Sequence, residues 1–312
     1  MKRSSKKEKE QTEEETISSS SDESISDIEL GLELFNMSPK DYHAIKMLLA
    51  QALDGSMLAE KGGKLVSPDI TSLTRFVTGP LAEYLGSTAK PSEGEGEKGE
   101  EEDPVAMLSL VPLQWDASLG FDEKQMDISV DEIKKLAKSM VLLLKESARQ
   151  SATLTKQQKK QVEVALESRS ALIFSERFMN LSAEIVPAMY QQLLDDLPAA
   201  IDESVIFDPE WIFLWMPLFN EVAETSSKTK KRKKVEEEEK EVEKGFEYYY
   251  AEGELAEAMA EAFWDIKISS ARMPDSRRAF GDRGIETARR VLLFSKNSFT
   301  SFVQQLPSFV SQ

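Results

Sequence analysis

The sequence predicts a mixed α/β (α+β) protein in which helices flank a single central sheet. Two observations indicate this class. Amphipathic helical segments alternate along the chain with short apolar runs typical of strands, and the two kinds interleave instead of forming separate blocks. With 40% apolar residues in 312, the chain can also bury a substantial core. We therefore expect one folded domain interrupted by charged excursions.

The first 26 residues are Lys, Glu and Ser almost throughout. Such a segment buries too little apolar surface to offset the entropy lost on ordering, so we expect a disordered tail. The folded domain is then expected to span residues 27–312. Two further segments, 87–103 and 225–244, have a similarly charged composition and are expected to be disordered loops.

The N-terminal part of the domain predicts a strand over 27–35 and two helices. Ser38 can cap the first helix, with Pro39 at its first position and Asp41 completing a capping box. A second helix is expected from Ser67 onward, broken near Gly79.

Beyond the first charged loop the sequence predicts a buried strand, two helices, a short strand and a third helix. The expected ranges are Ala106–Leu113, 129–147, 155–168, Ala171–Phe174 and 185–197. The last of these helices carries Ile185, Met189, Leu193 and Leu197 every four residues. Ser129 and Glu132 form a second capping box.

The C-terminal part predicts four strands and a closing helix. Trp211–Phe219 reads as a central strand whose pairing Pro217 should restrict. The other strands are expected at 245–250, 262–269 and 288–295, and the helix at 298–310.

Composition argues against several functional classes. The net charge of -17 disfavours direct nucleic-acid binding and favours basic partners, although it can also serve solubility alone. The chain has no cysteine and one histidine, His43, so thiolate and histidine metal sites and Ser-His-Asp triads lack material. The start of the chain has no apolar signal segment, and no apolar run is long enough to span a membrane, so we expect a soluble intracellular protein.

Motifs for catalysis are also missing from the sequence. No glycine-rich phosphate loop occurs, and the adjacent carboxylates Asp195 and Asp196 should diverge on a helix instead of converging across a cleft. Trp211 and Trp215 alternate on a strand, which is more typical of core than of a ligand site. We therefore expect no enzyme activity, no cofactor and no metal.

One charged segment has a functional interpretation. Its basic run matches a nuclear localisation signal and comprises Lys228, Lys230, Lys231, Arg232, Lys233 and Lys234. An acidic run, Glu236, Glu237, Glu238 and Glu239, follows at once and could bind a basic partner. Both runs are also compatible with an exposed loop of no specific function, but for the basic run we favour the localisation signal.

Two blocks of the chain resemble the BCCIP family, whose fungal members are called Bcp proteins. The first is FNMSPKDYHAIKMLL, in which Asp41, Tyr42 and His43 match a D-[YF]-H-x-I-K-x-L-L pattern. The second is SERFMN and the acidic, leucine-rich helix after it. Its matching residues are Ser175, Glu176, Arg177, Phe178, Met179, Asn180, Pro187 and Tyr190. The resemblance covers most of residues 27–306 and is weaker over 251–285.

The resemblance implies a fold like that of GNAT-type acetyltransferases, here without the acetyl-CoA loop, and a non-catalytic nuclear binding role. Fungal members of the family are associated with chaperoning a large-subunit ribosomal protein and with nuclear export of a lipid kinase, which implies contact with nuclear transport factors. Animal members bind a recombination mediator and a cyclin-dependent kinase inhibitor, which implies a genome-maintenance and cell-cycle scaffold as the alternative. The leading expectation is a nuclear chaperone, shuttling to the cytoplasm, that holds a basic ribosomal protein. A catalytic acetyltransferase is the least favoured alternative.

Overall fold

The computed structural model describes residues 31–53, 58–59, 65–66, 68–79, 81–92, 102–115, 127–178, 181–204, 206–221, 245–267 and 285–311. Residues Gly31–Gln312 form one compact unit. The predicted tail, the run 225–244 and Asn180 lie outside the described residues.

The described chain alternates strands and helices, as its patterning predicts. The strands are β1 (Leu32–Asn36), β2 (Leu58–Ala59), β3 (Leu65–Val66), β4 (Gly86–Pro91), β5 (Ala106–Pro112), β6 (Ser170–Arg177), β7 (Trp211–Glu221), β8 (Glu247–Tyr248), β9 (Ala262–Lys267) and β10 (Ile285–Ser295). The helices are the 3₁₀ turn η1 (Pro39–Asp41), α1 (Tyr42–Leu53), α2 (Ile70–Val77), α3 (Ala82–Leu85), α4 (Val130–Gln150), α5 (Lys156–Glu167), α6 (Ile185–Asp202), α7 (Glu252–Met259) and α9 (Lys296–Val310).

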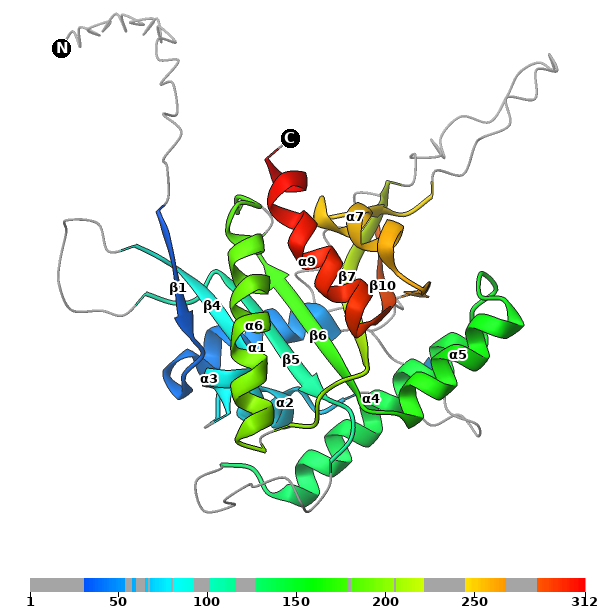
Figure 1. The fold of residues 1–312 in the computed structure, drawn as a ribbon, viewed down its shortest axis with the longest axis horizontal. Coiled ribbons are helices and arrows are strands. Elements are labelled where there is room, and N and C mark those ends of the chain that lie inside the picture. The colour runs from blue at the N-terminus through cyan, green and yellow to red at the C-terminus, as the bar shows by residue number, and fades with distance from the viewer. Residues whose placement is uncertain are drawn as a thin grey trace, which may run out of the picture. The chain divides into compact units, whose positions relative to one another are not determined.

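The strands other than β2 and β3 form one central sheet in the order β1-β4-β5-β6-β7-β10-β9, with β8 added beside β7. Pairing is antiparallel except between β6 and β7, which run parallel. Helices cover both faces. In Figure 1, α6 and α9 lie in front of the sheet while α1 crosses behind it. The predicted class, a single sheet flanked by helices, is therefore confirmed.

Caps fix where several helices begin. The capping boxes predicted at Ser38 with Asp41 and at Ser129 with Glu132 are both formed, and Thr155 with Gln158 adds a third. Helix α2 begins instead at Asp69, whose carboxylate accepts a hydrogen bond from the Thr71 N–H at 3.0 Å.

Among the differences from the sequence prediction, two concern β4 and the segment before α7. The loop predicted from residue 87 begins too early, because β4 extends to Pro91 between β1 and β5. Its Ser87 and Thr88 are polar yet buried. Their backbones pair with β1 and β5, and the Thr88 hydroxyl donates to the Phe35 carbonyl at 3.3 Å. The strand predicted over 245–250 is also too long: only Glu247 and Tyr248 pair with β7, and helix α7 follows.

Pro217 limits the pairing of β7 on one side only. Strand β7 pairs with β10 along all eleven of its residues, with Pro217 opposite Arg289. Its pairing with β6, however, stops at Trp215. The Pro217 carbonyl accepts a hydrogen bond from the Tyr249 N–H at 3.3 Å, so the position of its missing N–H also faces away from β10. The proline thus ends the parallel ladder and leaves the antiparallel one intact.

Candidate protein-binding surface

The first family-like block places one residue in the interior and two near the surface. Asp41 is buried and forms a salt bridge with Lys90 on β4, with the carboxylate oxygen 2.7 Å from Nζ. Tyr42 is half-buried on α1, and His43 is exposed with its ring edge-on to Tyr42 at 5.4 Å. Asp41 therefore anchors the start of α1 to the sheet, whereas His43 has no acid–base partner among the described residues.

The second block forms the junction between β6 and α6. Ser175, Glu176 and Arg177 are buried at the end of β6, whereas Phe178, the next residue, is 44% exposed. Pro187 lies in the first turn of α6, where a proline removes no helical hydrogen bond. The block therefore contributes mainly to the core, with Phe178 as its exposed part.

Arg177 and Glu252 form a buried ion pair between β6 and α7. The two guanidinium nitrogens lie 2.5 and 3.0 Å from the two carboxylate oxygens, and the guanidinium stacks 3.8 Å from the centre of the Tyr250 ring. Burial alone would lower the pKa of Arg177, but the hydrogen bonds and charge of Glu252 outweigh it and hold that pKa above its ordinary value. This pair fixes α7 against the end of β6.

Tyr250 occupies the place where β6 and β7 no longer pair. Its hydroxyl accepts a hydrogen bond from the Arg177 N–H and donates one to the Arg177 carbonyl, satisfying backbone groups that β7 leaves free. The side chain is buried, and burial raises the pKa of its hydroxyl. The space between the parallel strands is thus filled by the protein's own residues.

On the opposite face of the sheet, Arg289 of β10 caps the C-terminus of α1. Its Nε donates to the Ala52 carbonyl at 2.9 Å and its guanidinium also bonds the Gln51 carbonyl. The Trp215 indole donates to Ala52 as well, at 3.0 Å. A cation at a helix C-terminus complements the macrodipole, and Glu176, 4.0 Å from the guanidinium, partly balances its charge.

The outer surface of α6 and the turn after it are acidic. No lysine or arginine occurs between Arg177 and Lys228, whereas the same stretch contains nine acidic residues. Asp195 and Asp202 are exposed on α6 and Asp196 is half-buried, and none of the three forms a salt bridge with a described residue. Partial burial, followed by the charge of Asp195, raises the pKa of Asp196. We refer to Asp195, Asp196 and Asp202 as the α6 acidic surface.

Basic side chains gather elsewhere, on the helical hairpin of α4 and α5. The two helices carry eight of them, namely Lys134, Lys135, Lys138, Lys145, Arg149, Lys156, Lys159 and Lys160. Helix α4 packs against α2 and β9, whereas α6 packs against α3, α9, β4 and β5. Charge is therefore unevenly distributed, and the α6 acidic surface is a local concentration of negative charge instead of a uniform coat.

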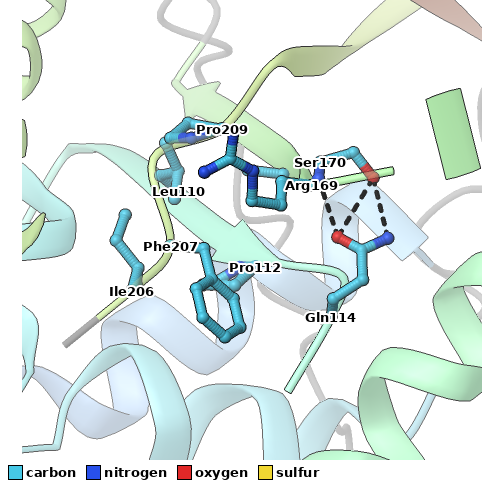
Figure 2. Close-up of a pocket in the computed structure, with 9 residues that line it drawn as sticks. Leu110, Pro112, Gln114, Arg169, Ser170, Ile206, Phe207 and Pro209 are labelled. Atoms are coloured by element: carbon cyan, nitrogen blue, oxygen red, sulfur yellow. Dashed lines mark hydrogen bonds between the residues drawn. The ribbon is translucent and has the colours of Figure 1, made fainter. Parts of the chain in front are cut away.

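A small pocket lies where β5 and β6 meet the segment before β7 (Figure 2). Gln114 lines one side of it, with its amide oxygen 2.7 Å from the Ser170 backbone nitrogen and its amide nitrogen 3.1 Å from the Ser170 hydroxyl oxygen. The cavity volume of about 10 Å³ is close to that of a single water site. The pocket is too small for a cofactor or a drug-sized ligand.

Within the described ranges, no group of three or more His, Asp or Glu side chains is placed to hold a metal ion. Nor is any helix there long and apolar enough to cross a bilayer. The localisation-like run Lys228–Lys234 and the acidic run Glu236–Glu239 fall outside the described residues, so the structure does not place them.

Sequence reasoning did not single out the α6 acidic surface as a candidate for binding. Asp195 and Asp196 stood out only as a possible catalytic pair, and α6 carries them at its surface with no cleft beside them. The signal that could have found the surface is the long interval free of basic residues. Glu252 and Tyr250 were also missed, because their roles depend on Arg177, more than seventy residues earlier.

The chain is similar to fungal proteins over nearly its whole length. It is 26% identical to Protein BCP1 of Debaryomyces hansenii over 289 residues, which cover 89% of this chain and 85% of that protein. It is 27% identical to Protein bcp1 of Schizosaccharomyces pombe over 290 residues, covering 91% of each.

A solved structure and a family profile also match. The crystal structure of BCP1 from Saccharomyces cerevisiae aligns with a TM-score of 0.49 and 16% identity, covering 95% of this chain and 93% of that one. The BCCIP profile matches residues 27–256, well over half of the sequence. The chain belongs to the BCCIP family.

Proposed function

We propose that this protein is a non-catalytic nuclear chaperone or adaptor that holds a basic client, namely a large-subunit ribosomal protein. The observation that carries the proposal is the α6 acidic surface, whose three carboxylates form no salt bridge with a described residue. A basic client would supply their counter-charges. Free ribosomal proteins are strongly basic, and covering their charge limits unspecific contact with RNA.

The position of these carboxylates supports a binding role over a stabilising one. Asp202 is the last residue of α6, where a negative charge opposes the helix macrodipole. Asp196 is partly desolvated next to Asp195, which raises its pKa and disfavours its charged form. Acids that weaken their own helix are expected where function requires them.

The non-catalytic part of the proposal is supported by the junction of β6 and β7. If the scaffold is of the GNAT acetyltransferase type, as the resemblance implies, Tyr250 fills the space between its parallel strands. The ion pair of Arg177 with Glu252 closes the same region. Titration calorimetry with acetyl-CoA should therefore show no saturable heat; a saturable isotherm would revive the acetyltransferase reading.

Nuclear import through the basic run Lys228–Lys234 completes the proposal, with transport factors as further partners and export of a client as a second task. The run should act as a signal: a fluorescent fusion of the full chain should be nuclear, and changing Lys230, Lys231 and Arg232 to Ala should leave it in the cytoplasm. An unchanged nuclear signal would remove this part of the proposal.

The decisive test is affinity purification of the tagged protein from native nuclear extract at about 0.1 M and about 0.5 M salt, followed by mass spectrometry. We expect one stoichiometric ribosomal protein that is lost at the higher salt. The variant Asp195→Asn/Asp196→Asn/Asp202→Asn should lose most of it even at low salt.

A matched control changes net charge equally without touching α6. Glu102, Glu247 and Glu286 are all exposed and lie outside α6, and changing all three to Gln should leave capture unaffected. Equal losses from both triple variants would show that only overall charge matters. If recombination or cell-cycle proteins are recovered and no ribosomal protein is, the chaperone hypothesis is wrong and the genome-maintenance and cell-cycle scaffold is favoured.

A further inference from the structure

Strand β1 is an edge of the central sheet with one side unused. Its inner side pairs with β4, and no described strand lies on its outer side. The Ser92 N–H donates to the Gly31 carbonyl at 2.7 Å, which sets the alternation: Gly31, Glu33 and Phe35 bond toward β4. The backbone groups of Leu32, Leu34 and Asn36 therefore point outward, where no described strand pairs with them.

Apart from the charge of Glu33, this edge lacks the features by which proteins usually block strand addition. Strand β1 contains no proline, no lysine and no bulge, and its register with β4 is continuous over five residues. It also carries Phe35, which is 41% exposed. At the opposite edge, β9 has no large apolar side chain as exposed as Phe35, since Trp264 and Ile266 are buried.

On one face of β1, a basic side chain of β4 already lies beside Glu33 and Phe35. On the α1 face, Lys90 of β4 sits directly opposite Glu33. Its Nζ lies 5.5 Å from the centre of the Phe35 ring and is also bound to Asp41. An added strand on the free side would place its own side chains in the same relation to Glu33 and Phe35, which favours basic residues there.

The other face of the edge is apolar and borders the α6 acidic surface. Leu34 packs partly against the core on this face. Beside it, Asn36 accepts a hydrogen bond from the Gln192 amide of α6 at 3.1 Å, and Asp196 lies one helical turn beyond Gln192. An added strand would therefore need apolar side chains beside Leu32 and Leu34, and its flanking residues would meet negative charge.

We propose that β1 binds its partner by strand addition, accepting an extended segment in which apolar and basic residues alternate. The apolar residues cover Leu32 and Leu34, and the basic residues lie beside Glu33 and Phe35. The proposal rests on the proposed function, because it takes the partner to be the basic client, and it adds where and in what conformation that client is held.

The test uses the full-length protein and a fluorescein-labelled nonapeptide of alternating lysine and valine, followed by anisotropy at low salt. Of two derivatives, one carries N-methyl groups on the valine amides and the other on the lysine amides, so each lacks one alternate set of backbone donors. In strand addition only one of these two sets of amides donates to β1. An antiparallel segment should lose affinity at least about tenfold on valine methylation, and a parallel one on lysine methylation. Equal effects of both, or of neither, would overturn the proposal.

Changes in the protein give a second readout. Leu34→Pro removes an outward N–H and leaves the β4 ladder intact. It also removes a side chain that packs partly against the core, so the unfolding temperature should fall modestly, whereas peptide affinity should fall at least about tenfold. Phe35→Ser should weaken binding, whereas Val164→Ser, at a 48% exposed site on α5, should not. If Leu34→Pro folds and binds like the wild type, the edge is not the site.

Failure of this inference is distinguishable from failure of the proposed function. If the nuclear extract yields a ribosomal protein but the methylated peptides behave alike, the client binds elsewhere and only strand addition is wrong. If the peptide binds with a preferred methylation register but no basic protein is captured, the edge is a strand acceptor and the client assignment is wrong. The remaining alternative occupant of β1 is a second copy of this chain. Light scattering would detect it as a molar mass that increases with protein concentration.

Discussion

The Tyr250 hydroxyl bonds both backbone groups of Arg177, accepting from its N–H at 3.1 Å and donating to its carbonyl at 2.7 Å. One side chain thereby does what a neighbouring strand would do. It is needed because the pairing of β7 with β6 stops at Trp215, and the Pro217 carbonyl bonds the Tyr249 N–H instead of β6. The end of the β6–β7 ladder leaves the Arg177 backbone groups without a strand partner, and the Tyr250 hydroxyl supplies that partner.

Removing this hydroxyl should destabilise the fold. Tyr250→Phe keeps the ring that stacks on Arg177 but leaves a buried N–H and carbonyl without their partner, at a cost of about 1–3 kcal/mol. Urea unfolding followed by tryptophan fluorescence measures it. Tyr84→Phe is the control, since its hydroxyl bonds Glu203 at the surface and its loss should cost little. Equal effects of the two changes would contradict the structural role of Tyr250.

Glu252→Gln should be more damaging, because it leaves the Arg177 guanidinium buried beside a neutral amide. Breaking a buried ion pair from one side costs about 3–5 kcal/mol. Changing both residues to Met removes the uncompensated charge and should restore much of the lost stability. Comparison of the single and double variants by chemical unfolding checks this; a double variant as unstable as Glu252→Gln would show that the pair is not an independent unit.

Arg289→Met should loosen the C-terminal turn of α1. The change removes two charge-assisted bonds to the Gln51 and Ala52 carbonyls and the favourable charge at the helix end, costing about 2 kcal/mol or more. Amide exchange should accelerate in the last turn of α1 before it changes in α4. The control is Arg75→Met, which replaces a partly exposed arginine on α2. If Arg289→Met accelerates exchange equally in α1 and α4, Arg289 stabilises the whole fold and not the end of α1 alone.

Asp196→Asn should stabilise the protein at neutral pH while weakening client capture. The folded-state pKa of Asp196 is raised, so its ionised form is disfavoured by folding. Its contribution to stability is present below the unfolded pKa of about 3.8 and is lost as pH rises through the folded pKa. The stabilising effect of Asn should thus appear at pH 7 and vanish near pH 3.

Thermal unfolding of both proteins across this pH range checks the prediction. Asp131→Asn serves as the opposite case, because Asp131 lies in the first turn of α4 where its charge favours the helix. That variant should be less stable than the wild type at pH 7. A lower unfolding temperature for Asp196→Asn at pH 7 would contradict the conclusion that the charge of Asp196 destabilises the fold.

Sequence patterning predicted those elements whose side chains repeat with a clear period. The stripe of Ile133, Leu136 and Met140 and its capping box gave α4, and the apolar run from Trp211 gave β7. Strand β4 escaped because its residues Ser87, Thr88 and Ala89 are small or polar, and they are buried by backbone pairing on both sides. Burial of that kind depends on neighbours distant in sequence and leaves no periodic signal.

The candidate site was less predictable than the fold. The α6 acidic surface was visible only as an absence of lysine and arginine, and the free edge of β1 follows from strand order, which no local pattern determines. Resemblance to the BCCIP family directed attention to Ser175, Glu176 and Arg177. These residues are buried and contribute mainly to the core, so a matching motif need not mark the surface that binds.

The place of β10 between β7 and β9 has a consequence for synthesis of the chain. Strand β7 is almost entirely apolar, and its eleven-residue antiparallel partner begins about 60 residues later. At about 5–20 residues per second, the ribosome needs several seconds to deliver that partner. During this interval one edge of a tryptophan-rich strand has no neighbour, so this protein should itself depend on general chaperones while it is being made. Any fragment that stops at residue 256, where the family profile ends, would remain permanently in that unfinished state.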